Sequence, residues 1–245
     1  MQTIQEVIDR LNIIVSDEIS AQSALGYFAA LYRRMTMAVR DGIASGAFED
    51  GKRMEQLDMI FAQRYLDAYD SWKKNSPLSS SWKVSFTAAA KNKLIVLQHL
   101  LLGINAHINL DLGIAAATIC PGDRIHSLKN DFVKINSVIK GLMEVTEDEL
   151  SKIWWPLRWF DIILHRADEN IANVGILLSR GGAWEFAVEL AYCNESEREN
   201  HIHFRDQIIG AIGTDILNPG IWATIILAII KKGERGTVAE KISLL

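Results

Sequence analysis

The stretch 94–120, LIVLQHLLLGINAHINLDLGIAAATIC, decides the fold of this chain. It is apolar on every side of a helix, which predicts a buried central helix over about 94–118. Five polar side chains interrupt the run: His99, Asn105, His107, Asn109 and Asp111. A neutral polar group that is buried without a partner costs roughly 2–7 kcal/mol, so these groups are expected to bind one another, a metal or a ligand. The sequence therefore predicts a functional site on this helix.

Composition limits what the whole chain can be. Its 245 residues are 49% hydrophobic, enough to bury a substantial core in a single helical domain over 1–245. The net charge is −4 and no basic block occurs, which argues against a nucleic-acid partner. The two cysteines, Cys120 and Cys193, form neither a metal-ligand spacing nor a disulfide framework. A reducing compartment fits this usage, so the expected location is cytoplasmic.

Three apolar stretches have some features of targeting or membrane segments. The first 20 residues carry Asp and Glu among their apolar positions, which predicts a helix rather than a signal peptide. The run 221–230 is shorter than the roughly 20 residues of a spanning helix, and Gln98 and His99 interrupt the run 94–102. We expect buried helices of a soluble protein and no membrane span.

Helical periodicity recurs along the chain and no β-hairpin pattern stands out, so the predicted fold is all-α, a compact multi-helix bundle. Asp50 and Gly51 are expected to open one helix, and Gly103 to allow close packing of another. Besides the central helix, the predicted helices cover about 4–19, 22–45, 52–74, 82–89, 123–141, 147–155, 157–178, 183–192 and 196–212, with a last one starting at Pro219.

The spacing of the polar residues predicts which of them meet. His107 and Asp111 lie one turn apart on one face of the helix, with Asn105 and Asn109 on roughly the opposite side. His99 lies two turns before His107.

The next helix is expected to complete the site. A turn at Pro121 and Gly122 would fold that helix back against the central one. At ~1.5 Å per residue, Asp131 then falls at the height of Asp111, and Asn136 near that of His107. This register predicts a carboxylate on the facing helix beside the His107–Asp111 pair.

Two kinds of chemistry fit this set. As a metal site, His107, Asp111 and Asp131 would bind zinc, iron or manganese, and a metal-bound water would serve hydrolysis. Without a metal, His107 and Asp111 would act as general base and orienting group, with Asn105 as a third catalytic residue. The further side chains expected to contact a ligand are Asn109, His99, Arg64 and Asn136.

Other interpretations stay open. The buried polar groups suit an enzyme for a partly apolar small molecule, a non-catalytic module that binds a hydrophobic molecule, or a structural network whose function lies elsewhere. Arg64 either pairs with Asp58 or orients Asp111, Asp131 or an anionic ligand. The oligomeric state stays open.

The string INAHINLDL resembles the signature of an uncharacterised, largely bacterial family known only as a domain of unknown function. The matching residues are Ile104, Asn105, Ala106, His107, Asp111 and Leu112. Upstream, LDMIFAQRYLDA resembles a second family block and matches it at Leu57, Asp58, Phe61, Arg64 and Tyr65. Downstream, the pattern is met at Asp131, Phe132, Arg180, Trp184 and Ala187.

This resemblance covers roughly residues 25–190. Positions 99 and 109 vary in the family, which weakens His99 and Asn109 as site residues, and the family implies no activity. A fainter resemblance, to helical zinc hydrolases, is limited to a His-x-x-x-Asp on a buried helix, because this chain lacks their further histidines.

Overall fold

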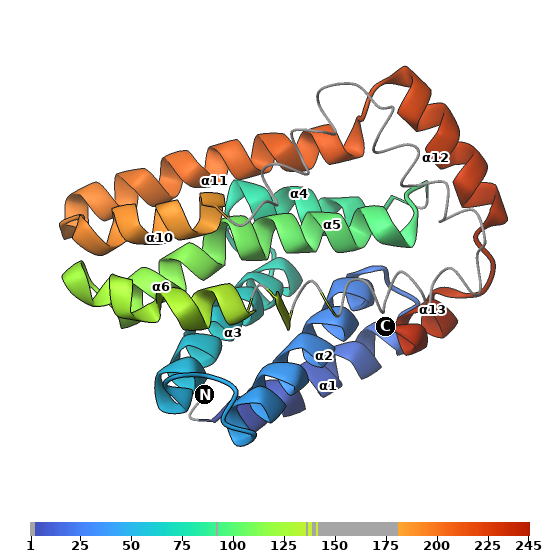
Figure 1. The fold of residues 1–245 in the computed structure, drawn as a ribbon. Coiled ribbons are helices and arrows are strands. Elements are labelled where there is room, and N and C mark those ends of the chain that lie inside the picture. The colour runs from blue at the N-terminus through green and yellow to red at the C-terminus, as the bar shows by residue number, and fades with distance from the viewer. Residues whose placement is uncertain (1–2, 92, 136, 139–140, 142–180) are drawn as a thin grey trace.

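The computed structural model describes residues 3–91, 93–135, 137–138, 141 and 181–245. Within these ranges every regular element is a helix (Figure 1), which confirms the all-α prediction. The helices predicted over 147–155 and 157–178, and Arg180, lie outside the described residues.

The predicted central helix is present but is not uniform. It runs through three consecutive segments: α5 (Val96–Ala106), the π-helical turn η1 (His107–Leu112) and α6 (Gly113–Ile119). Almost all of its residues are buried, as the apolar sequence requires. The wide π turn coincides with the polar residues His107, Asn109 and Asp111. A π turn inside an α-helix is rare and is often found at functional sites.

Two groups of helices enclose this central helix (Figure 1). On one side lie α1 (Ile4–Ser20), α2 (Leu25–Ala44) and α3 (Gly51–Lys73). On the other side lie α4 (Ser80–Ala89), α10 (Gly181–Tyr192) and α11 (Glu195–Leu217). As predicted, Asp50 caps α3, because its side chain accepts a hydrogen bond from the backbone N–H of Arg53 at 3.0 Å.

The structure differs from the sequence prediction at two places. The chain after Pro121 was expected to enter one α-helix over 123–141, but Gly122–Leu128 is a 3₁₀ helix, η2, and 129–135 is helical after it. The last predicted helix is in fact two, α12 (Ile221–Gly233) and α13 (Val238–Leu244). Between them, the C-cap Glu234 has an extended backbone, and Gly236 has a φ of 90°.

Gly103 lets α2 approach the central helix closely, as predicted. A Cβ at this position would overlap the ring of Phe28 on α2. In the described part of the chain, one helical run, Val96–Ile119, is long and apolar enough to cross a membrane by length and composition. Since 89% of that window is buried among the other helices, it has the character of a core helix.

Candidate functional site

The π turn η1 is held open by contacts from outside the helix. Arg205 of α11 donates from Nε to the backbone oxygen of Asn109 at 3.1 Å, and from Nη2 to that of Gly182 at 3.1 Å. A carbonyl in a π turn loses the usual α-helical partner, so a side-chain donor there stabilises the wider turn. The guanidinium also lies 5.1 Å from the centre of the Phe186 ring.

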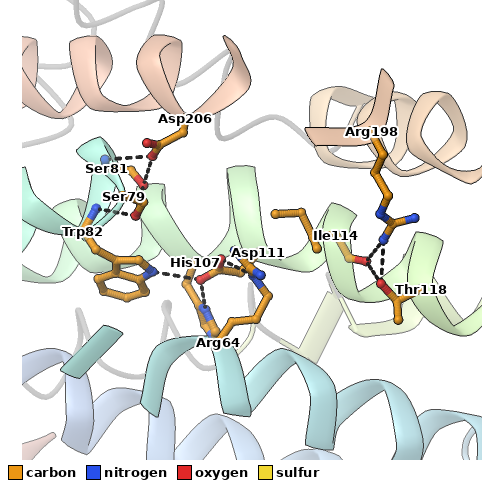
Figure 2. Close-up of polar contacts among 10 residues, drawn as sticks. All are labelled: Arg64, Ser79, Ser81, Trp82, His107, Asp111, Ile114, Thr118, Arg198 and Asp206. Atoms are coloured by element: carbon orange, nitrogen blue, oxygen red, sulfur yellow. Dashed lines mark hydrogen bonds and ion pairs between the residues drawn. The ribbon is translucent and has the colours of Figure 1, made fainter. Parts of the chain in front are cut away.

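Asp111 is the centre of the polar contacts (Figure 2). Its Oδ2 lies 3.1 Å from His107 Nδ1 and accepts a hydrogen bond from Trp82 Nε1 at 2.9 Å. Its Oδ1 accepts one from Arg64 Nε at 2.6 Å. Three donors from η1, α4 and α3 therefore fix one buried carboxylate. The sequence predicted the His107–Asp111 pair, left the contact from Arg64 open as one of several alternatives, and gave no indication of Trp82.

An aromatic cluster surrounds the imidazole of His107. The Phe61 ring stacks on it with centroids 3.6 Å apart and planes 8° apart, and the Tyr32 ring lies edge-on at 4.5 Å. The other rings of this aromatic cluster are Phe28, Tyr65 and Trp82. Inside it, His107 is fully buried, and its Nε2 has no hydrogen-bond partner among the residues that the structure describes.

Charge and burial set the protonation states of the pair. Burial alone would raise the pKa of Asp111, but the hydrogen bond from His107 and the charge of Arg64 hold that pKa below its ordinary value. Burial lowers the pKa of His107 despite the neighbouring carboxylate. At neutral pH the pair is therefore an ionised Asp111 and a neutral imidazole. Because Nδ1 faces the carboxylate, Nδ1 carries the proton and Nε2 carries the free lone pair.

Trp82 is positioned by a second carboxylate. Asp206 of α11 accepts hydrogen bonds from the backbone N–H groups of Ser80 and Ser81 and from the hydroxyl of Ser81, at 2.6, 2.9 and 2.7 Å. Ser79 caps the same helix by accepting from the backbone N–H of Trp82 at 3.4 Å. These contacts hold the first turn of α4, from which Trp82 reaches Asp111 (Figure 2). No spacing in the sequence indicates this link.

The predicted metal site is not assembled, and Asp131 is the residue that fails to join it. Asp131 accepts hydrogen bonds from the backbone N–H groups of Glu49 and Asp50 and pairs with Arg53 at 2.8 Å, at the start of α3. Arg64, which binds Asp111, lies about 14 residues further along α3 than Asp50, hence roughly 21 Å away at ~1.5 Å per residue.

Asp131 lies elsewhere because the predicted register between the central helix and the next helix does not form. The predicted hairpin of two α-helices is replaced by η2, and α10, from far along the chain, packs against α6. In the part of the chain that the structure describes, no group of three His, Cys, Asp or Glu is placed to hold a metal ion.

Asn105 and Asn109 lie on the other side of the central helix, as predicted, and are used there. Asn105 donates from Nδ2 to the backbone oxygen of Ile209 at 2.9 Å, and its Oδ1 accepts from Asn109 Nδ2 at 3.0 Å. These amides therefore tie α11 to the central helix, and the hydrogen bonds of Asn105 go to Ile209 and Asn109 rather than to His107.

His99 does not join the site either. It lies eight residues before His107, roughly 12 Å along the helix, and its ring packs 5.6 Å from that of Tyr27. Burial and the charge of Lys231 lower the pKa of His99 to about 4. The last predicted ligand contact, Asn136, lies outside the described residues.

Two polar side chains beside the aromatic cluster were not predicted as site residues. The hydroxyl of Tyr32 and Oδ2 of Asp58 are buried, and neither makes a well-formed hydrogen bond to any residue that the structure describes. Asp58 does not pair with Arg64, which is bound to Asp111. The signal for this part of the site was available in the block 57–68, where Asp58 and Phe61 are three residues apart and so share a helix face.

Comparisons with known proteins agree with the sequence resemblance. A family model described as "Family of unknown function (DUF5995)" matches residues 4–219, a longer range than the 25–190 expected from motifs. No curated protein and no solved structure gives a significant match.

Proposed function

The chain belongs to the family of unknown function DUF5995, which brings no activity with it, and we propose that it is an enzyme that uses His107 as a general base on a small, partly apolar molecule. One observation carries this proposal: His107 Nε2 is fully buried and has no partner in the described part of the chain, while Asp111 holds the other nitrogen of the ring. A base needs a free lone pair in a fixed direction, and this arrangement supplies one.

The roles follow from the contacts. Asp111 orients the imidazole, keeps the proton on Nδ1 and stabilises the imidazolium that forms when Nε2 takes a proton. Arg64 and Trp82 are positioning residues, because they act through Asp111 and hold it ionised. Arg64 is also 34% exposed, so it connects the buried pair to the protein surface. The aromatic cluster supplies apolar walls for a ligand.

A second candidate is a non-catalytic module for a hydrophobic small molecule. The observation that favours it is the aromatic cluster itself, in which five rings surround the imidazole of His107. Hydrolysis is also compatible with the first proposal, since the same base can take a proton from a water bound to Nε2 and so activate it as a nucleophile.

Mass spectrometry of a small-molecule extract incubated with the protein tests both candidates. We expect the wild type to consume or form a compound, and His107→Gln to lose this conversion by about 10²–10⁴-fold. His99→Gln is the matched control, since it replaces another buried histidine with a lowered pKa. Equal conversion by wild type and His107→Gln would contradict a catalytic role. Retention of a molecule without conversion, lost in His107→Gln, would favour the binding module.

A further inference from the structure

Tyr32 and Asp58 are two buried polar residues that the proposed role of His107 does not use. Tyr32 is 1% exposed and Asp58 3% exposed, and within the described residues neither the Tyr32 hydroxyl nor Asp58 Oδ2 makes a well-formed hydrogen bond. Burial raises the pKa of the Tyr32 hydroxyl, and its polar neighbour Thr36 lowers that pKa to a lesser extent. Burying such groups unpaired destabilises the fold, and buried polar atoms are almost always satisfied in native proteins. Both residues lie on helices whose rings enclose His107, which itself has a nitrogen left unpaired by the described residues, and this arrangement indicates that a ligand supplies the missing partners.

Their placement brings them to the same aromatic cluster. The ring of Tyr32, on α2, lies 4.5 Å from the imidazole of His107. Asp58, on α3, lies one turn before Phe61, the residue whose ring stacks on that imidazole. The carboxyl of Asp58 is close enough to Tyr32 to raise the pKa of its hydroxyl. The three polar groups therefore come from three different elements packed together, α2, α3 and η1.

Their environment keeps both oxygens protonated. Burial and the charge of Glu55 raise the pKa of Asp58 to about 7. Burial, with the charge of Asp58 next, raises the pKa of Tyr32 well above its ordinary value. The other titratable groups that act on this pair are Tyr65 on α3 and Asp111 on η1, whose charge is compensated by Arg64. Below neutral pH the site therefore offers two O–H donors beside one nitrogen acceptor.

We propose that Tyr32 and Asp58 donate hydrogen bonds to the carbonyl oxygen of an apolar, enolisable substrate, while His107 Nε2 removes a proton from the adjacent carbon. This inference rests on the proposed function of His107. A tyrosine and a neutral aspartic acid in an apolar site can together stabilise an enolate oxygen. The substrate is an uncharged, largely apolar carbonyl compound, because aromatic rings and neutral donors line the site.

The proton transfer balances without a further reactant. The C–H bond next to the carbonyl breaks, its proton goes to Nε2, and its electron pair forms the new carbon–carbon double bond. The carbonyl π electrons move to the oxygen, where Tyr32 and Asp58 hold the developing charge. The imidazolium, stabilised by Asp111, returns the proton to the same carbon or to a conjugated one. The result is proton exchange or isomerisation, with no oxidation or reduction.

The first test asks whether Asp58 is a neutral acid in the folded protein. An infrared difference spectrum between the wild type and Asp58→Asn, recorded from pH 5.5 to 8.5, is expected to contain the carbonyl stretch of a buried protonated carboxyl. That band should disappear with a midpoint near pH 7, since the pKa of Asp58 is raised to about 7. A spectrum with no such band at pH 5.5 would overturn the proposal, because the donor pair would not exist.

The second test uses 2-naphthol, a fluorescent and stable analogue of an apolar enol. We expect saturable binding at pH 6, weakened about tenfold or more by Tyr32→Phe and by Asp58→Ala, because each removes one donor to a buried oxygen. Tyr27→Phe is the matched control: Tyr27 is also buried on α2, but it packs on His99. At pH 8.5 the wild type should bind 2-naphthol more weakly, because Asp58 is then ionised. Asp58→Asn stays neutral and should keep its binding at this pH.

The outcomes separate the two proposals. No saturable binding by the folded wild type, or equal binding by Tyr32→Phe and Asp58→Ala, would overturn the donor pair. If naphthol binding depends on Tyr32 and Asp58 but His107→Gln still converts the metabolite, the donor pair stands and the base is another residue. Loss of conversion in His107→Gln, together with naphthol binding that depends on Tyr32 and Asp58, supports both.

Discussion

Phe61 lies flat against His107, with ring centroids 3.6 Å apart and planes 8° apart. This stacking fixes the plane of the imidazole, and the hydrogen bond to Asp111 then fixes its rotation within that plane. The direction of the Nε2 lone pair is therefore determined by one residue of α3 and one of η1.

Replacement of Phe61 by alanine should loosen the imidazole and destabilise the fold. Truncation of a buried phenylalanine typically costs about 3–5 kcal/mol, because a cavity replaces the ring. Water that enters this cavity would also relieve the burial that lowers the pKa of His107. Urea unfolding and NMR titration of His107 measure the two effects. An unchanged pKa of His107 in a destabilised variant would show that burial by Phe61 does not lower that pKa.

Asp111→Asn should destabilise the protein by about 3 kcal/mol, since it removes a buried carboxylate that binds Arg64, Trp82 and His107. The pKa of Asp111 is lower in the folded than in the unfolded state, so its contribution is present above the unfolded pKa, near 3.9. It is lost as the pH falls through the folded pKa. The difference between wild type and variant should therefore shrink below about pH 4, as urea midpoints at several pH values would show.

The same variant has a spectroscopic consequence. An asparagine no longer requires a proton on Nδ1, so the imidazole of His107 should lose its fixed tautomer. Nitrogen-15 chemical shifts of the ring report this directly. A wild-type spectrum with the proton on Nε2 would refute the assignment of Nε2 as the free base.

Asp58→Asn should change the pH dependence of stability in the direction opposite to that expected for Asp111→Asn. The folded pKa of Asp58, about 7, lies above the unfolded value near 3.9, so between these values only the folded state holds the proton. Wild-type stability should then fall by about 1.4 kcal/mol per pH unit across part of this window through this group alone. The variant lacks this loss. Its free energy of unfolding, measured by chemical denaturation, should therefore rise relative to that of the wild type between pH 4 and 7. Parallel curves would contradict a buried neutral acid.

Gly103→Ala should destabilise the protein by about 1–3 kcal/mol, because the added methyl group overlaps the Phe28 ring and forces α2 away from the central helix. Gly141→Ala is the control: a Cβ at Gly141 meets no atom of the described residues within 4 Å, and alanine is the better helix former. Thermal unfolding of both variants checks the comparison, and equal melting temperatures would contradict the close contact.

Asp131→Asn should weaken the start of α3 without affecting His107. The carboxylate accepts two backbone N–H groups and the guanidinium of Arg53, so its loss should cost about 1–3 kcal/mol. Since the site lies far along α3, the NMR signals of the His107 ring should stay in place. A large shift of those signals would mean that Asp131 does act on the His107 site.

The sequence predicted the local parts of this molecule better than its long-range contacts. The bounds of most helices and the His107–Asp111 pair follow from periodicity and i,i+4 spacing, which depend on neighbours within a turn or two. Asp131 was misplaced because its position depends on how the chain leaves Pro121, and a 3₁₀ helix replaced the expected α-helix. Trp82 and Tyr32 reach the site from other helices, and nothing in their local sequence indicates which helix they face.

A π turn holds one residue more than an α turn, so η1 is in effect a one-residue insertion in an ordinary helix. Deletion of a single codon between His107 and Asp111 would remove the extra residue and leave α5 and α6 in register as one plain α-helix. The His107–Asp111 spacing would then change from i,i+4 to i,i+3, and the contact between the two side chains would be altered. The same step in reverse creates the wide turn from a plain core helix. A single inserted residue therefore distinguishes this site from an ordinary buried helix. A library of single-codon deletions across 100–116 would reveal whether the fold can be kept while the site is lost.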